Sequence, residues 1–395
     1  MQRRQIFNLL GASALTLGSG GQLFAAGSNQ PRFLLVFLRG GYDAANLLVP
    51  VSSDFYYQSR PNIAIAKPSP ELNSALPLEA NWGLHPALRD SIFPLFQNGE
   101  AAFIPFAGTE DTSRSHFETQ DSIELGQSLG ATRDYRSGFL NRLCATLRGA
   151  DPMAFTSQLP IALQGSVQVP NMALGSIAKP SVDARQSSII TAMYGGTRLA
   201  SSVTEGFTVR DQVMREMVAE MDAASRNAIT SKGFELEARR IARLMKDRYN
   251  VGFVDVGGWD THVGQGGASG YLASRFDELG RGLAAYAQEM GPMWKNTTVY
   301  VLSEFGRTFR QNGNGGTDHG HGSVHWVLGG GIRGGKVLGE QLAVEQATLF
   351  QNRDFPVLND YRAVLAGLFK RQFGLNASQS EQVFAGVKPR DIGIL

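Results

Sequence analysis

Residues 297–325 read TTVYVLSEFGRTFRQNGNGGTDHGHGSVH, an apolar run followed by a loop that is rich in glycine, histidine and aspartate. The stretch begins with a hydrophobic, β-branched run that is typical of a buried strand and stops at Ser303 and Glu304. The chain has six histidines, and three of them lie in the loop that follows. Because α/β proteins gather ligands where their strands end, the stretch predicts a metal site at the carboxyl edge of a sheet. The candidate ligands in it are Glu304, Asp318, His319, His321 and His325.

Three further apolar runs predict strands, and each is followed by polar residues. The run RFLLVFL is continuous, as expected of a central strand that is buried on both faces. Asp43 follows it, either as a functional carboxylate or as an ordinary turn residue. The run VGFVDV leads into a loop in which Asp260 and His262 are two positions apart, so one ion can contact both side chains. A hydrogen-bonded Asp–His pair without metal is the alternative. The three strands are expected at 32–38, 101–106 and 251–256.

The strand at 101–106 is followed by a polar segment that runs into a helix starting near Phe117. A hydroxyl of this segment would lie at a helix N-terminus, where main-chain N–H groups favour an anion or a nucleophile that becomes phosphorylated or sulfated. Simple capping of the helix by Ser113 or Ser115 is the alternative, and the residues alone leave the two readings level. Arg114 and His116 are also part of this segment.

Helical patterns fill most of the remaining chain. Apolar spacing predicts helices at 86–96, 139–148 and 271–294, and a long helical segment at 202–247 with a break at 227–233. The helical segment at 202–247 is expected to cover one face of the sheet or to form a small cap beside the site. A short apolar strand is expected at 160–163.

The N-terminal residues resemble an export signal of the twin-arginine type. Arg3 and Arg4 precede a moderately apolar segment and then small residues, and the net charge of the whole chain is only +2. Residues 1–27 are therefore expected to direct the protein through the twin-arginine translocase to the periplasm or the exterior. No later segment has the apolar length of a membrane span, and no basic run points to nucleic acid. The single cysteine, Cys144, excludes a disulfide framework and a cysteine-rich zinc site.

Five of the six histidines lie at or near the ends of predicted strands, together with several carboxylates. Imidazoles and carboxylates without thiolates suit zinc, manganese, iron, calcium or magnesium. The number of candidate ligands is sufficient for two divalent ions, which could hold the attacking and leaving oxygens of a displacement.

The motifs RGGYDAAN, SRSHFETQD, DVGGWDTH, SEFGRT, GTDHGHG and HWVLGGGIRGG follow one another along the chain. They resemble those of a bacterial family of twin-arginine-exported proteins, domain of unknown function family 1501, which is described as sulfatase-like and placed near the alkaline phosphatase superfamily. The resemblance covers nearly the whole chain. It implies an α/β fold, a three-layer α/β/α sandwich of the alkaline phosphatase and sulfatase type with a mostly parallel sheet. This domain would span 28–395, with a helical cap or cover at about 202–248.

The resemblance also implies roles for single residues. Asp43 would bind metal, Ser113 or Ser115 would be the nucleophile, and Asp260 with His262 would bind one ion. Glu304 and Phe305 stand where the wider superfamily has Asp-His, and His319 would supply the missing imidazole, with His321 or His325 completing the set. The sulfatase signature Cys-x-Pro-x-Arg is absent from the chain, which argues against a formylglycine sulfatase.

The sequence thus predicts an exported, metal-dependent hydrolase that acts on a small or polymeric phosphate or sulfate ester. Arg114 and Arg307 are expected to face the anionic oxygens of the substrate, and Ser115 or Ser113 to attack it. One alternative is a non-catalytic exported protein that keeps the fold and a structural metal and serves in surface assembly or polymer binding. Another is that the loops bind Ca²⁺ only for stability. The predicted ligands are Asp43, His116, Asp260, His262, Glu304, Asp318, His319, His321 and His325.

Overall fold

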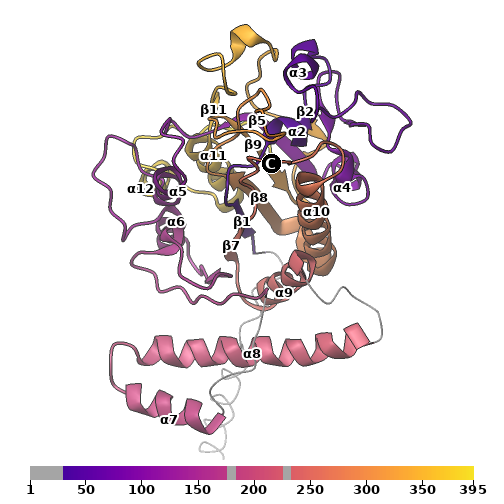
Figure 1. The fold of residues 1–395 in the computed structure, drawn as a ribbon. Coiled ribbons are helices and arrows are strands. Elements are labelled where there is room, and N and C mark those ends of the chain that lie inside the picture. Colours follow the sequence, from indigo (N-terminus) through magenta and orange to yellow (C-terminus); the bar gives the residue numbers. More distant parts are fainter. Residues whose placement is uncertain (1–29, 176–183, 226–232) are drawn as a thin grey trace, which may run out of the picture.

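The computed structural model describes residues 30–175, 184–225 and 233–395 (Figure 1). The expected export signal at 1–27 lies outside these residues, as does most of the expected helix break at 227–233.

A central sheet runs through the molecule, and its strands arise from the apolar runs of the sequence. Its order is β10-β5-β9-β8-β1-β7-β6, with β11 beside β5. β9 is antiparallel to both of its neighbours, β5 and β8, and the other paired strands are parallel. The strands are β1 (Arg32–Leu38), β5 (Ala101–Gly108), β6 (Pro152–Ala154), β7 (Val251–Val256), β8 (Thr297–Ser303), β9 (Ser323–Leu328), β10 (Lys336–Val337) and β11 (Asn359–Asp360).

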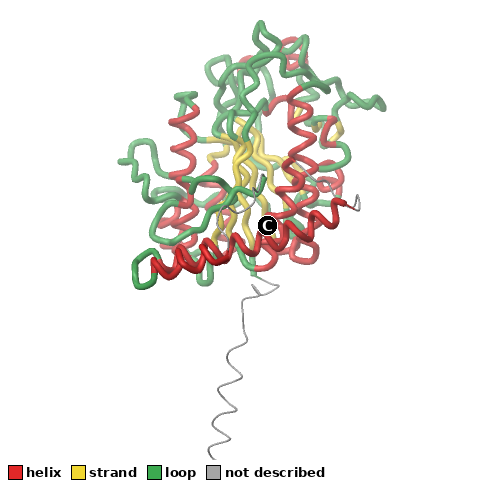
Figure 2. The backbone as a smooth tube through the Cα atoms, turned by 60° about the horizontal axis from the view of Figure 1, so that its bottom comes forward, coloured by secondary structure: helices red, strands yellow, loops and turns green. Residues whose placement is uncertain are grey.

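The sheet separates two hydrophobic cores, because successive side chains of a strand point to opposite faces. Leu34, Val36 and Leu38 of β1 enter one core, and Phe33, Leu35 and Phe37 enter the other. Helices cover both faces of the sheet (Figure 2), so the expected three-layer α/β/α sandwich with a mostly parallel sheet is confirmed. The first core contains side chains of α2 (Ala44–Leu47), α4 (Ile92–Gln97), α9 (Gly233–Asp247) and α10 (Tyr271–Met290). The second contains side chains of α5 (His116–Leu125), α6 (Phe139–Thr146), α11 (Tyr361–Phe373) and α12 (Ala377–Val383).

Three sequence-based expectations differ from the structure. The strand expected at 160–163 is a 3₁₀ helix, Ile161–Leu163, because local bonds from Leu163 N to Pro160 O and from Gln164 N to Ile161 O close the chain into turns. The helix expected at 86–96 is divided into a 3₁₀ turn, Pro86–Leu88, and α4. The helix expected at 271–294 ends at Met290, and a 3₁₀ helix, Gly291–Asn296, follows it.

The long helical segment after residue 200 consists of two helices in different places. α9 packs along α10 on the first face of the sheet. α8 (Ala200–Ser225) runs beside α7 (Ala184–Tyr194) at the edge where the strands begin (Figure 1). There Glu205 pairs with Arg248 at 2.8 Å, three residues before β7 starts. Of the helices in the described ranges, none combines the length and the hydropathy needed to cross a bilayer.

The carboxyl ends of β1, β5, β7 and β8 lie at the same edge of the sheet, since these four strands run in one direction. The segments that follow β1 and β7 pack closely there. Gly40 has a φ of +128°, and a Cβ atom on it would lie 2.6 Å from the main-chain nitrogen of Asp260. A glycine is therefore needed for the two loops to meet. This edge is where the sequence places the candidate ligands.

A candidate metal centre at the carboxyl edge of the sheet

Three histidines surround one carboxylate at this edge. Nε2 of His262 lies 2.9 Å and Nε2 of His319 lies 3.2 Å from Oδ1 of Asp260. Nε2 of His116 lies 3.5 Å from the other oxygen, Oδ2. The Nε2 atoms of His262 and His319 are 3.1 Å apart. We call these four residues the His/Asp cluster. They come from the start of α5, the loop after β7 and the loop after β8.

Each of the three imidazoles is held through its other ring nitrogen. Nδ1 of His116 contacts Oε1 of Glu304 at 2.8 Å, and Nδ1 of His262 contacts Oδ1 of Asp318 at 3.2 Å. Nδ1 of His319 contacts the main-chain oxygen of Arg114 at 3.0 Å. These partners are hydrogen-bond acceptors, so each Nδ1 carries the proton and each Nε2 presents a lone pair. This is how histidines are oriented toward a metal ion.

Glu304 stands behind His116 and reaches the cluster only through that ring. Its Oε1 accepts hydrogen bonds from Gly40 N and Gln120 Nε2, both at 2.8 Å, and Oε2 accepts one from Ser303 Oγ at 2.8 Å. Burial acts to raise the pKa of Glu304, but the hydrogen bonds from His116 and Gln120 hold it below its usual value. The bond to Glu304 in turn raises the pKa of His116. The structure thus places Glu304 as the carboxylate that orients His116, whereas the sequence suggested a ligand.

Asp260 is held from the protein side by Arg307. Nη1 of Arg307 donates to Oδ1 of Asp260 at 2.7 Å, and its Nη2 donates to the main-chain oxygen of Thr317 at 2.6 Å. Burial acts to raise the pKa of Asp260, but the hydrogen bond and charge of Arg307 keep it below the usual range. The side chain of Arg307 is fully buried. It therefore orients Asp260 and does not face the solvent side, where the anionic oxygens of a substrate were expected.

Arg114 is also engaged by a carboxylate of the protein. Its Nε and Nη2 donate to Oδ2 of Asp354 at 2.9 and 2.6 Å, and its main chain has a φ of +55°. The carboxylate of Asp354 is buried. The guanidinium that was expected to bind substrate is thus engaged with Asp354, while the carbonyl of the same residue holds His319.

The two candidate serines differ in their surroundings. The hydroxyl oxygen of Ser113 accepts a hydrogen bond from Ser115 N at 3.3 Å and lies 3.3 Å from Thr119 Oγ1. Ser115 is the N-cap residue of α5, yet among the residues the structure describes its hydroxyl makes no capping hydrogen bond. The Ser115 hydroxyl therefore does not cap α5, which was the alternative that the sequence left open.

Three of the predicted ligands lie apart from the cluster. Asp43 is buried, and its Oδ2 accepts hydrogen bonds from Arg60 Nη1 at 2.5 Å and Gln265 Nε2 at 2.6 Å. His321 packs against the ring of Phe350. His325 is on β9 within the second core region, where its Nδ1 contacts the Tyr300 hydroxyl at 2.9 Å. A strand, rather than the expected loop, carries His325 away from the edge.

Among the residues that organise the site, sequence reasoning missed Arg60, Gln120 and Gln265. For Gln120 a signal existed, because it lies four positions after His116 and therefore on the same face of α5. Arg60 and Gln265 lie in segments without such a pattern.

The donor set of the cluster fits a divalent metal ion. Within the described residues, Nε2 of His116 is buried and has no hydrogen-bond partner, although its ring is fixed by Glu304. One ligand atom each from His116, Asp260 and His319 lie within 4.8 Å of one another. Imidazole with one carboxylate suits zinc, iron or manganese.

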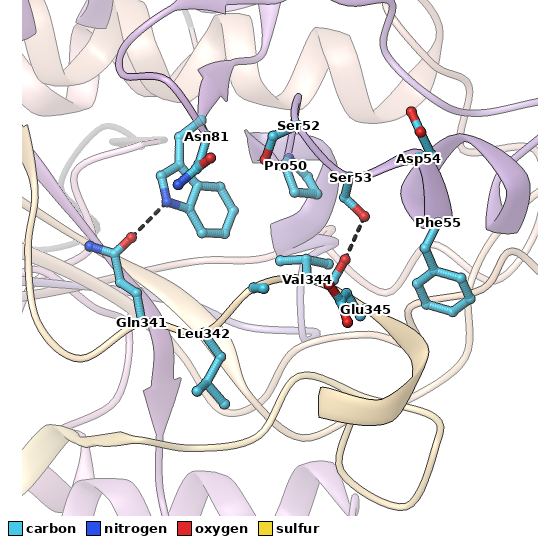
Figure 3. Close-up of a pocket in the computed structure, with 12 residues that line it drawn as sticks. Pro50, Ser52, Ser53, Asp54, Phe55, Asn81, Gln341, Leu342, Val344 and Glu345 are labelled. Carbon is cyan, nitrogen blue, oxygen red and sulfur yellow. Dashed lines mark hydrogen bonds between the residues drawn. The ribbon is translucent and has the colours of Figure 1, made fainter.

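A separate cavity of about 570 Å³ lies between segments 50–55 and 341–345 (Figure 3). Its polar walls are bonded internally: Trp82 Nε1 donates to Gln341 Oε1 at 2.7 Å, and Ser53 Oγ donates to Val344 O at 2.5 Å. The cavity is lined by other residues than the His/Asp cluster, so we assign the candidate site to the cluster.

Comparison with solved structures gives distant likenesses. The crystal structure of Ps i-CgsB in complex with k-i-k-neocarrahexaose matches at 9% identity and a TM-score of 0.39, over 91% of this chain and 75% of that chain. A protein in the alkaline phosphatase superfamily from Vibrio parahaemolyticus matches at 11% identity and a TM-score of 0.35, over 85% of this chain and 71% of that chain.

No curated protein matches the chain. The family model described as "Protein of unknown function (DUF1501)" matches residues 30–386, which include every residue of the His/Asp cluster. The chain therefore belongs to the DUF1501 family.

Proposed function

We propose that the protein is a metal-dependent hydrolase of phosphate or sulfate esters, with one divalent ion held by His116, Asp260, His262 and His319. The observation that carries this proposal is the convergence of three Nε2 atoms on the Asp260 carboxylate while every Nδ1 is engaged by an acceptor. A bound divalent cation would supply Lewis-acid polarisation of the ester and would lower the pKa of a nearby hydroxyl.

The openness of the cluster favours catalysis over a structural metal. Structural metal sites close their coordination with protein atoms, whereas catalytic sites keep a position open to solvent or substrate. The side chains of Asp260 and His262 are 44% and 41% exposed. An ion held there would be accessible to a substrate from solution, which supports the enzyme over the non-catalytic alternative.

Ser115 is our candidate for the attacking group. It directly precedes His116 and starts α5, where main-chain N–H groups of the first turn favour the negative charge of an ester group. Attack by the Ser115 oxygen would form an O–P or O–S bond and break the bond to the leaving oxygen, and the alcohol would leave with the proton of the hydroxyl. Water would then displace the phosphate or sulfate and restore the hydroxyl. Ser113 is the weaker candidate, because its oxygen already accepts a hydrogen bond from Ser115 N.

We also propose that the protein is exported by the twin-arginine route to the periplasm or the exterior, on the sequence pattern of residues 1–27. Replacing Arg3 and Arg4 together by Lys is expected to leave the protein in the cytoplasm with an unprocessed N-terminus. Export at the normal level in that variant would contradict the proposal.

The hydrolase is tested by metal analysis combined with activity. Protein purified after native export is expected to contain a divalent ion and to hydrolyse an aryl phosphate or an aryl sulfate. His319→Ala is expected to lose most of the metal and the activity. Metal-loaded protein that hydrolyses neither ester would refute the hydrolase, and full metal content in His319→Ala would refute the assigned ligands.

A further inference from the structure

The ligands of the His/Asp cluster come from loops that are far apart in the sequence. Asp260 and His262 lie in the loop after β7, and His319 lies in the loop after β8. Oδ1 of Asp260 and the Nε2 atoms of His262 and His319 lie 2.9 to 3.2 Å from one another. A small change in the spacing of these two loops would therefore change the geometry that an ion meets.

Gln265 belongs to the loop after β7, and its side chain links this loop to the loop after β8. Its Oε1 accepts hydrogen bonds from Thr261 Oγ1 at 3.2 Å and from Thr317 Oγ1 at 3.1 Å. Thr261 lies between Asp260 and His262, and Thr317 comes two positions before His319. One fully buried amide thus contacts a neighbour of the ligands in each loop.

The orientation of this amide is fixed by a buried ion pair. Nε2 of Gln265 donates to Oδ2 of Asp43 at 2.6 Å, and the same oxygen accepts from Arg60 Nη1 at 2.5 Å. Because a carboxylate paired with a guanidinium only accepts hydrogen bonds, the NH₂ group of Gln265 must face Asp43. Its carbonyl oxygen must then face the two threonines.

Arg60 ties the ion pair back to the loop after β8. Its Nε donates to Phe309 O at 2.6 Å and its Nη2 to Thr308 O at 3.1 Å. The side chains of Arg60 and Asp43 are 0% and 1% exposed. The chain of contacts Arg60, Asp43, Gln265 is therefore closed off from water and connects β1 with both loops.

We propose that Gln265, oriented by the Arg60–Asp43 pair, is a positioning residue that sets the spacing of the two ligand loops and so controls the affinity for the metal ion. The inference rests on the proposed function for the identity of the ion's ligands. Gln265 acts without touching the ion, since its polar atoms are taken by Asp43, Thr261 and Thr317. Substitutions of groups behind metal ligands lower metal affinity by about 10- to 100-fold.

The test is Gln265→Met, which keeps the length and approximate volume of the side chain but removes its hydrogen bonds. Binding of Zn²⁺ or Mn²⁺ to metal-free protein is measured by calorimetry, and the unfolding of the metal-free protein is followed in parallel. The expected result is affinity reduced by about 10- to 100-fold. Affinity within twofold of the unsubstituted protein would overturn the proposal.

Asn141→Leu is the matched control. Asn141 is also buried, and its amide joins α6 to residues 163 and 167, away from the cluster. It is expected to lose stability as well, but to bind the ion with unchanged affinity. An equal loss of affinity in Asn141→Leu would show that any buried amide has this effect, and the proposal would fail.

Thr261→Val provides a milder change should Gln265→Met fail to fold. It removes one of the two hydroxyls at Gln265 Oε1 and is expected to weaken binding by several-fold. If Gln265→Met does fold, the effects of the two substitutions should not add in the double variant, since both remove the contact between Gln265 and Thr261. Absence of metal binding by the unsubstituted protein would refute the proposed function, whereas normal binding by Thr261→Val and Gln265→Met would refute this inference alone.

Discussion

The main-chain oxygen of Arg114 accepts a hydrogen bond from Nδ1 of His319 at 3.0 Å, although the two residues are 205 positions apart. Arg114 adopts a φ of +55°, a conformation that is uncommon for residues other than glycine. Its guanidinium is held by Asp354 at 2.6 Å. The ion pair therefore maintains the backbone conformation that directs the Arg114 carbonyl to His319, and it lies two residues before His116.

Asp354→Ala is predicted to weaken metal binding, because Arg114 would lose the partner that fixes its backbone. We expect affinity for Zn²⁺ to fall by about tenfold and the free energy of unfolding by about 2 kcal/mol. Calorimetric titration and urea unfolding of the metal-free protein measure the two effects. Arg353→Ala is the control: its Nη1 is 3.4 Å from the same oxygen of Asp354 and its side chain is 39% exposed, so affinity should be unchanged. Unaltered affinity in Asp354→Ala would contradict the assigned role of Arg114.

Ser115→Ala is predicted to remove the hydrolytic activity while leaving metal content intact. Loss of a nucleophile should lower kcat by more than about 10³-fold with an aryl phosphate or sulfate. Ser113→Ala should lower it far less, because the Ser113 oxygen serves the loop through Ser115 N. Mass spectrometry of acid-quenched protein should detect a phosphate or sulfate adduct on Ser115. An active Ser115→Ala variant would exclude this serine as the nucleophile.

The sequence predicted the central strands from their apolar runs. It also predicted that the polar residues after these strands lie close together. The apolar runs at 32–38 and 251–256 coincide with β1 and β7. Because β1, β5, β7 and β8 point the same way, polar residues that follow them must meet, and the structure brings together His116, Asp260, His262, Asp318 and His319.

Side-chain direction could not be predicted in the same way. His325 was assigned to a loop, but the run SVHWVL forms β9, and alternation along that strand turns His325 to the face that contains Tyr300. Asp43 and Arg307 do follow strands, but no pattern in the sequence indicates that Asp43 pairs with Arg60 or that Arg307 pairs with Asp260. Strand ends bring polar residues together, while the pairing among them determines which lie in the His/Asp cluster and which hold its members in place.

The free energy of unfolding is predicted to decrease as the pH is lowered, because two buried histidines stay neutral in the folded chain. Burial lowers the pKa of His85 to about 4 and that of His325 to about 3, from 6.5. Between 6.5 and these values the unfolded chain binds protons that the folded chain does not, so the free energy of unfolding decreases as the pH falls. The contribution is fully present above the unfolded pKa and is lost progressively below it, by about 1.4 kcal/mol per pH unit for each histidine.

His325→Gln should make this pH dependence shallower by about 1.4 kcal/mol per unit between pH 6 and pH 4.5. Urea unfolding at several pH values measures the slope, and His85→Gln should give the same reduction. A slope unchanged by His325→Gln would mean that His325 is not neutral in the folded protein at pH 6.

The metal content is predicted to be one ion per chain, although the sequence suggested two. Among the predicted ligands outside the His/Asp cluster, Asp43 is already paired with Arg60, and water is excluded from this pair. Asp43→Asn should therefore still hold one ion per chain when the metal is supplied in excess, although its affinity should fall because Asp43 orients Gln265. It should nevertheless be less stable, by about 3 kcal/mol, because the buried Arg60 loses its counter-charge. Elemental analysis of both proteins decides the matter. Two ions in the unsubstituted protein and one in Asp43→Asn would show that Asp43 is a ligand, with Arg60 displaced when metal binds. One ion in both proteins would mean that the guanidinium of Arg60, and not a second metal ion, neutralises the carboxylate of Asp43.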